Sequence, residues 1–169
     1  MNSKRIAFLL LAFTVILFDQ LGKFHAARTI EIGGRVPLLG DLLALTHLPV
    51  AGGAFGFFQD WMPSSQLIGF ALLSIMATLV IITFYRGLAR GEHGSAAALG
   101  AILGGIASNT VDRVRYGSGF DFLHLGPVTA DTVPDFNLAD VAIVLGVVTL
   151  IVELLATEMA ARVSERPRG

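Results

Sequence analysis

Four long stretches of this sequence contain no charged residue, and they restrict the folds open to the chain. A membrane-spanning helix needs about 20 consecutive, mostly apolar residues. The second stretch meets this length alone, and the others reach it by including one or two polar residues at their ends. Only 15% of the residues are charged, whereas soluble domains carry about 25%. The uncharged stretches are residues 6–18, 61–85, 95–111 and 141–152.

The sequence therefore predicts an all-α membrane protein with four transmembrane helices. A small β-rich outer segment is expected between the first and second helices, and residues 1–169 are expected to form a single integral membrane domain. The helices are predicted at about residues 5–24, 62–86, 94–113 and 137–158. The outer segments are predicted at about residues 25–61 and 114–136.

The first apolar stretch has a competing interpretation as a cleaved secretory signal peptide, because the basic "MNSKR" precedes it. Asp19 and Lys23 follow the apolar run at once, and only "HAAR" offers a cleavage site, a poor one. We therefore favour a retained first span.

The basic residues indicate the orientation of the spans. Both termini and the short "RGLARGEHG" connection are basic, whereas most acids fall in the two longer connections. Because cytoplasmic loops carry the excess of Lys and Arg, we expect both termini in the cytoplasm and the longer segments outside. The basic residues assigned to the cytoplasmic side are Lys4, Arg5, Arg86, Arg90, Arg162, Arg166 and Arg168.

Composition excludes several function classes. A net charge of −1 argues against nucleic-acid binding, which requires a basic face. The chain has no cysteine, which removes disulfides, thiolate nucleophiles and cysteine-based metal sites. The chemistry must then use carboxylates, His, Ser, Lys or the backbone, and we expect no metal and no cofactor.

The outer segments favour short strands and turns. Residues 29–32 alternate in polarity, apolar runs broken by prolines follow, and residues 51–56 ("AGGAFG") indicate close backbone approach. In the second segment, residues 120–125 ("FDFLHL") alternate as a strand does, between glycine turns. Irregular backbone cannot face lipid, so these segments should pack on the helix ends.

Two short motifs place Asn and Asp three residues apart on one helical face, "NTVD" at 109–112 and "NLAD" at 137–140. In the second motif, Asn137 is a predicted N-cap and Asp140 occupies the third helical position, where the helix dipole favours a carboxylate. Asp112 instead falls near a helix C-terminus, where the dipole disfavours it. We expect Arg113 or Arg115 to pair with Asp112.

These motifs and Asp121, which is flanked by two phenylalanines, form a constellation at the outer ends of spans 3 and 4. Two carboxylates at a poorly hydrated surface cannot both ionise easily, and one protonated and one ionised carboxylate sharing a water are the groups that aspartic proteolysis uses. A carboxylate-lined small membrane carrier and a structural polar cluster remain alternatives. A metal site through His124 and Asp121 is weaker, and serine nucleophile motifs are absent from the sequence. The members are Asn109, Asp112, Arg113, Asp121, Asn137 and Asp140.

The order of five short motifs closely resembles the lipoprotein signal peptidases, the signal peptidases II, which are four-helix aspartic proteases of the bacterial inner membrane. The resemblance covers nearly the whole chain. The motifs are "FDQLGK" (18–23), "GGAFG" (52–56), "SNTVDR" (108–113), "GFDF" (119–122) and "FNLAD" (136–140).

The resemblance implies roles for individual residues. It places the two catalytic aspartates at Asp121 and Asp140. Residues implied to support the site or contact substrate are Asn109, Asp112, Arg113, Asn137, Asp19 and Lys23.

The resemblance also implies the reaction and its setting. The expected reaction is cleavage of a prolipoprotein just before its diacylglyceryl-modified cysteine, which releases the signal peptide. The partners would be lipid-modified prolipoproteins and membrane lipid, and the protein would act as a monomer. The outer segment 25–60 would lie on the membrane over the substrate.

The sequence departs from the family pattern at two positions. Val50 stands where an Asn that contacts substrate is expected, and Ser108 stands where Gly commonly precedes the Asn. We expect retained activity with altered substrate or inhibitor contacts, although a specialised or non-catalytic paralogue is an alternative. Because the helix dipole favours its ionised form, Asp140 is expected to be the base.

Overall fold

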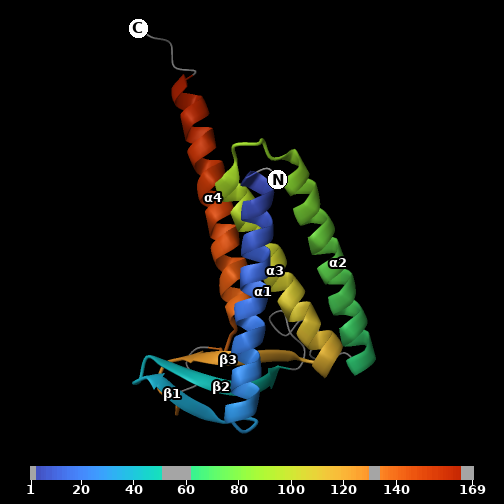
Figure 1. Cartoon of the computed structure of the whole chain (residues 1–169), viewed down its shortest axis with the longest axis vertical. Helices are drawn as coiled ribbons and strands as arrows, with labels where there is room; N and C mark the ends of the chain where they lie inside the picture. Colours follow the sequence, from blue (N-terminus) through green and yellow to red (C-terminus); the bar gives the residue numbers. More distant parts are fainter. Residues whose placement is uncertain (1–2, 51–61, 130–133, 165–169) are drawn as a thin grey trace.

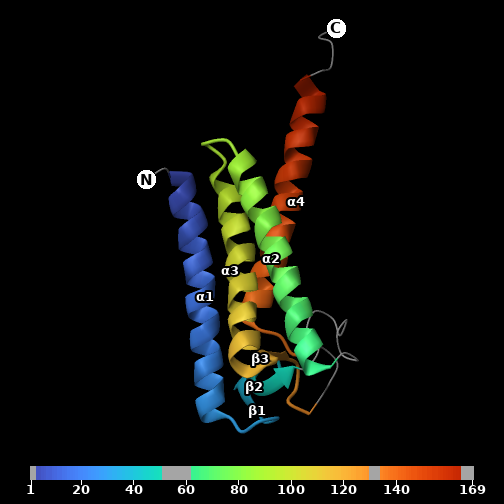
Figure 2. The same ribbon diagram turned by 90° about the vertical axis from the view of Figure 1, so that its right-hand side faces the viewer.

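The molecule consists of long helices and a small sheet that lies across one end of them (Figure 1). The structure is a computed structural model that describes residues 3–50, 62–129 and 134–164. The first residue of α1 and the last of α4 lie at the end of the helices opposite the sheet (Figure 2). Within the described ranges the helices are α1 (Ser3–Thr29), α2 (Pro63–Gly87), α3 (His93–Tyr116) and α4 (Leu138–Ser164).

All four helices are long and apolar enough to cross a membrane, which agrees with the four spans predicted from the sequence. Their outward-facing side chains are largely apolar, as in Phe13 and Leu154, which are 64% and 71% exposed. Such exposure would be unfavourable in water and is expected in lipid.

Several helix ends differ from the predicted bounds. α1 continues past residue 24 to Thr29, because its last turns carry the sheet: Ala26 is fully buried against Phe120 and Phe122. α3 continues past residue 113 to Tyr116 and stops at Gly117, whose φ of 72° is a left-handed helix cap. α4 extends beyond residue 158 to Ser164 through residues that favour helix. The first outer segment therefore begins after Thr29.

α3 is the central helix, since it packs against each of the other three. Two adjacent glycines permit this close approach. A Cβ at Gly104 would lie 2.6 Å from the Ala12 carbonyl oxygen of α1, and one at Gly105 would lie 2.5 Å from the Ala139 carbonyl oxygen of α4. Small residues at helix contacts are the usual means of packing in membranes.

In the part of the chain that the structure describes, the sheet has three antiparallel strands in the order β1-β2-β3, which are Arg35–Leu39, Leu43–Val50 and Gly119–Leu125. The strand predicted from "FDFLHL" is confirmed as β3. The alternation at residues 29–32 was misleading: this stretch completes α1 and enters a turn at Gly33, whose φ is 82°. The glycine-rich residues 51–56 lie outside the described residues.

A two-residue bridge fixes the start of α4 beside the sheet. The N–H and C=O groups of Leu123 and Phe136 exchange hydrogen bonds of 2.9 Å. Phe136 directly precedes Asn137, so this pairing brings the first turn of α4 to β3. Asp121 and Asp140 are thereby held at the same end of the molecule.

Candidate functional site

The first turn of α4 is capped as the sequence predicted. The Asn137 side-chain oxygen accepts a hydrogen bond from the Asp140 N–H at 2.9 Å. In return, the Asp140 carboxylate accepts one from the Asn137 N–H at 3.3 Å. This reciprocal arrangement is a capping box. It leaves the Asp140 carboxylate in the first turn, where the helix dipole favours a negative charge.

Asn137 also holds the second carboxylate. Its side-chain Nδ2 donates to Asp121 Oδ1 at 2.8 Å and to the Phe120 carbonyl oxygen at 3.3 Å. A single side chain therefore contacts both Asp121 and, through its oxygen, the first turn that carries Asp140.

The pKa of Asp121 is raised to about 7, principally because the carboxyl group is buried. The negative charge of Asp140 raises it further, whereas the hydrogen bond from Asn137 and the charge of Lys23 act in the opposite direction. Asp121 can therefore hold a proton near neutral pH. Two carboxyl groups in electrostatic contact, one of them protonated, are suited to general acid and base roles.

Asn109 connects the Asp140 carboxylate to a buried cation. Its Nδ2 donates to Asp140 Oδ1 at 2.8 Å, and its Oδ1 accepts from Lys23 Nζ at 3.2 Å. Because the lysine can only donate, it fixes which end of the Asn109 amide faces Asp140.

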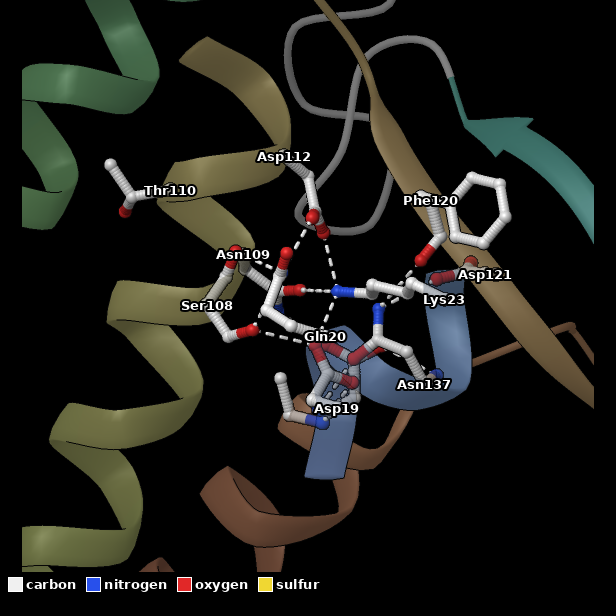
Figure 3. A network of polar contacts seen from close by, with 12 residues as sticks. Asp19, Gln20, Lys23, Ser108, Asn109, Thr110, Asp112, Phe120, Asp121 and Asn137 are labelled. Carbon is white, nitrogen blue, oxygen red and sulfur yellow. Dashed lines mark hydrogen bonds and ion pairs between the residues drawn. The ribbon is translucent and has the colours of Figure 1, made fainter. Parts of the chain in front are cut away.

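Lys23 is the centre of a buried ion cluster with Asp19 and Asp112 (Figure 3). Lys23 is 3% exposed and both aspartates are fully buried. Its Nζ lies 2.5 Å from Asp19 Oδ2 and also pairs with Asp112 Oδ2. The partner of Asp112 is thus Lys23, not Arg113 or Arg115 as the sequence suggested. The error arose because the contact joins α1 to α3 across sequence-distant positions.

Two members of this network were not selected from the sequence as site residues. Gln20 Nε2 donates to Asp112 Oδ1 at 2.8 Å and to Ser108 Oγ at 2.9 Å. Ser108 Oγ donates to Asp19 Oδ2 at 2.7 Å. A polar side chain within an apolar helix usually faces the protein interior, and this signal could have identified both.

Arg113 packs differently from the prediction. Its guanidinium group stacks over the Phe70 ring of α2, with Cζ 4.1 Å from the ring centroid, and its Nη1 donates to the Asn109 carbonyl oxygen at 2.8 Å. Its Nε is buried and has no hydrogen-bond partner among the described residues. Val50 pairs with Gly119 across β2 and β3, and a Cβ at Gly119 would lie 3.5 Å from Arg113 Nη2.

His124 lies in a separate group. Its Nδ1 is 2.8 Å from Asp135 Oδ1, and its Nε2 is 3.2 Å from the Pro127 carbonyl oxygen. Asp135 also pairs with Arg35 at 2.9 Å. Among the described residues, no three His, Asp or Glu side chains form a group that could hold a metal ion.

The structure thus joins the selected residues through a chain of contacts. Asn137 connects the two candidate aspartates, Asn109 connects Asp140 to Lys23, and Arg113 contacts the backbone of Asn109. The arrangement offers one carboxyl group that can hold a proton near neutral pH and a second carboxyl group, at the edge of apolar helices. Such a pair can activate water and protonate a carbonyl oxygen.

Comparisons with a family model and with individual known proteins point to the same family. A sequence model of the family described as Signal peptidase (SPase) II matches residues 11–156. This range includes every candidate site residue.

Individual relatives agree over most of their length. The chain is 37% identical to a lipoprotein signal peptidase of Geobacter sulfurreducens over 143 residues, which are 85% of this chain and 88% of that protein. It is 34% identical to one from Moorella thermoacetica over 148 residues, which are 88% and 92% of the two chains.

Solved structures show the same fold. A bacterial membrane enzyme determined by the in meso method at 2.3 Å resolution superposes with a TM-score of 0.80 at 24% identity, covering 96% of this chain and 93% of that one. A second, at 1.9 Å resolution, gives 0.76 at 26% identity, covering 88% and 92%.

Proposed function

Because the chain belongs to the signal peptidase II family, we propose that it is an aspartic endopeptidase in which Asp121 and Asp140 form the catalytic pair. It is a multi-pass protein of the bacterial inner membrane that cleaves signal peptides from prolipoproteins. The proposed bond is the one just before the diacylglyceryl-modified cysteine.

The contacts of Asn137 carry this proposal. One side chain hydrogen-bonds to Asp121 and caps the helix turn that presents Asp140. Capping alone would not require a contact with Asp121, since Ser, Thr or Asp can cap a helix equally well. An Asn that hydrogen-bonds both to Asp121 and to the helix turn carrying Asp140 is expected where the distance between two carboxyl groups must be fixed.

The two aspartates take different roles in the proposed reaction. Asp140 accepts hydrogen bonds from Asn109 and from the Asn137 N–H, and it sits at the helix N-terminus, so we assign it as the base. Asp121 is the acid, because burial and the charge of Asp140 raise its pKa.

The chemical step follows from these roles. Asp140 removes a proton from a water molecule, whose oxygen attacks the scissile carbonyl carbon while Asp121 donates its proton to the carbonyl oxygen. The tetrahedral intermediate then loses the amine, which takes the proton held by Asp140. The hydroxyl proton of the intermediate returns to Asp121 as the carbonyl re-forms, and both carboxyl groups regain their starting states.

We assign supporting roles to the surrounding polar groups. Asn109 and Lys23 orient Asp140, and Asp19 and Asp112 neutralise Lys23. The buried Arg113 Nε, which has no partner among the described residues, is suited to donate a hydrogen bond to a substrate carbonyl oxygen.

The proposed orientation places the site at the outer face and both termini in the cytoplasm. The basic termini support it, as does the position of the sheet, whose strand β3 carries Asp121, at the end of the helices opposite the start of α1 and the end of α4 (Figure 1). Substrate acyl chains would then lie in lipid while the scissile bond reaches the membrane edge. One chain supplies all of the proposed groups, which is consistent with action as a monomer.

The test is to purify Asp121→Asn and Asp140→Asn separately and to supply each with a diacylated prolipoprotein. Each variant should lose at least about 100-fold in cleavage rate, the size of a general acid or base contribution. The matched control is Asp41→Asn, which changes an exposed carboxylate in the turn between β1 and β2. Substantial cleavage by Asp121→Asn or by Asp140→Asn would refute the proposal that these two residues form the catalytic pair. A wild-type chain without cleavage would indicate a non-catalytic paralogue.

A further inference from the structure

Ser108 occupies an unusual position for a hydroxyl group in an apolar helix. It is fully buried on α3, where its Oγ donates to Asp19 Oδ2 at 2.7 Å and accepts from Gln20 Nε2 at 2.9 Å (Figure 3). Both hydrogen bonds are made to α1. A serine hydroxyl within a helix often donates to the backbone carbonyl four residues earlier in the same helix. The Ser108 hydroxyl instead joins two helices.

The contact continues from α1 to α4. The other oxygen of Asp19, Oδ1, accepts the Ala139 N–H at 2.9 Å. Ala139 precedes Asp140 and lies in the first helical turn, whose N–H groups have no partner within the helix itself. Asp19 therefore caps α4 from another helix, in addition to the cap that Asn137 supplies.

From this chain of contacts we propose that Ser108 is a positioning residue for the catalytic step. Its hydroxyl fixes the Asp19 carboxylate, Asp19 fixes the first turn of α4, and that turn sets the position of Asp140 relative to Asp121. The inference rests on the proposed function, because it assumes that these two aspartates form the catalytic pair.

The geometry explains why a hydroxyl group matters here. Asp19 Oδ2 already faces Lys23 at 2.5 Å, and the Ser108 hydroxyl gives the same oxygen a second donor in a defined direction. Lys23 is also shared with Asp112 and Asn109, so it does not by itself fix the rotation of the Asp19 carboxylate. The Ser108 donor on α3 fixes this rotation, because α3 packs against both α1 and α4.

Three substitutions of Ser108 separate positioning from packing. Ser108→Ala removes the donor and leaves a methyl group that excludes water. Ser108→Gly removes the donor but leaves room beside Asp19 and Gln20 for a water, which needs two or more polar partners. Ser108→Cys approximately keeps the shape of the side chain and offers only a weak donor.

We expect Ser108→Ala to lower kcat by about 10-fold, with KM changed by less than about 2-fold, because only the catalytic pair is displaced. Ser108→Cys should lose a similar factor in spite of its preserved packing. Ser108→Gly should be the most active of the three, although glycine is a poorer helix former than alanine by about 1 kcal/mol.

The pH profile distinguishes positioning from a general loss of stability. The pKa of Asp121 is raised by the charges of Asp140 and Asp135 and lowered by the charge of Lys23 and the hydrogen bond from Asn137. The Arg113 cation of α3 also interacts electrostatically with both Asp121 and Asp140. If Asp140 moves away in Ser108→Ala, its raising effect weakens. The loss of activity at alkaline pH should then begin at lower pH than in the wild type.

The matched control is Ser95→Ala on the same helix. Ser95 also donates to a carboxylate of α4, that of Glu153, but at the end of α3 remote from Asp121 and Asp140. It should leave kcat per folded molecule and the pH profile unchanged. Folded protein is quantified by size exclusion and thermal unfolding in detergent, and kcat and KM are obtained from initial rates at varied concentrations of a diacylated prolipoprotein in excess over enzyme.

Three results would overturn the inference: wild-type kcat in Ser108→Ala, an unshifted pH profile accompanied by lost stability alone, or lower activity in Ser108→Gly than in Ser108→Ala. These results are separate from failure of the proposed function. If Asp121→Asn and Asp140→Asn are inactive while all Ser108 variants behave as wild type, only the positioning role is wrong.

Discussion

Asn137 and Asp140 hydrogen-bond to each other twice, with the Asn137 side chain receiving the Asp140 N–H at 2.9 Å and the Asp140 carboxylate receiving the Asn137 N–H at 3.3 Å. The same Asn137 amide donates to Asp121. The start of a helix and the spacing of two carboxyl groups therefore depend on one side chain. This dependence allows the two contributions to be measured separately.

Replacement of Asn137 should separate stability from activity. Asn137→Ala removes the cap and should lower the free energy of unfolding by about 1 kcal/mol. Asn137→Ser retains a capping oxygen but not the amide donor to Asp121, so it should be nearly as stable as the wild type. Both variants should cleave at least about 10-fold more slowly. Thermal unfolding and single-turnover cleavage test this, and wild-type cleavage by Asn137→Ser would contradict it.

Cleavage should decline at alkaline pH as Asp121 loses its proton. The pKa of Asp121 is raised to about 7 by burial and by the charge of Asp140, so the acid form is lost as the pH rises through that value. The expected kcat/KM profile falls above about pH 7. Asn137→Ser removes a hydrogen bond that lowers this pKa, so its decline should begin at higher pH. A wild-type profile that is flat to pH 9 would exclude Asp121 as the acid.

The same group links stability to pH with a defined sign. The folded chain keeps the Asp121 proton up to about pH 7, whereas the unfolded chain releases it near the ordinary value of 3.8. The contribution of Asp121 to stability is therefore full below about pH 4 and is lost as the pH rises to 7. The difference in the free energy of unfolding between wild type and Asp121→Asn, measured from about pH 4 to pH 7, isolates this contribution. When Asp140 is replaced by Asn in both proteins, that difference should vary less with pH, because the charge that helps to raise the pKa of Asp121 is gone.

Loss of Lys23 should destabilise the protein more than loss of one aspartate. Lys23→Met leaves Asp19 and Asp112 buried without a cation, which costs about 3–5 kcal/mol. Asp112→Asn leaves a balanced Asp19–Lys23 pair and should cost less. The control Arg162→Met breaks an exposed pair with Glu158 and should change stability by at most about 1 kcal/mol. The order is checked by thermal unfolding, and an Asp112→Asn variant less stable than Lys23→Met would contradict it.

Gly105→Ala should displace the first turn of α4. The added Cβ would lie 2.5 Å from the Ala139 carbonyl oxygen, a backbone atom, so α3 and α4 must separate. Overpacking of this kind costs about 1–3 kcal/mol, and cleavage should fall with it. Gly87→Ala, at the end of α2, is the control because its Cβ would meet nothing within 4 Å. Equal stability and activity of the two variants would refute close α3–α4 contact at this position.

The helices and the α4 cap could be predicted because they depend on local sequence. Hydrophobic length identified the spans, and the three-residue separation of Asn137 and Asp140 was sufficient for a capping box. The "FDFLHL" alternation identified β3 for the same reason. Asp121 and Asp140 were placed at one end by the order of spans alone.

The contacts between helices could not be predicted in the same way. In water, the buried face of a helix is its apolar face, but lipid-facing residues such as Leu10 and Phe13 are apolar as well. The pattern therefore does not indicate which faces of α1 and α3 meet, and the Lys23–Asp112 pair was missed. The polar residues Gln20 and Ser108 were the remaining indication of that contact.

Asp19 and Lys23 are four residues apart on α1 and their charged atoms are 2.5 Å apart. Lys23 therefore has a counter-ion on its own helix, one turn away, before any later span is synthesised. Asp112 and the Ala139 N–H reach the pair only when the third and fourth spans follow. The catalytic pair that we propose is thus complete only after α4 has begun to be synthesised, because Asp140 lies in the first turn of that helix.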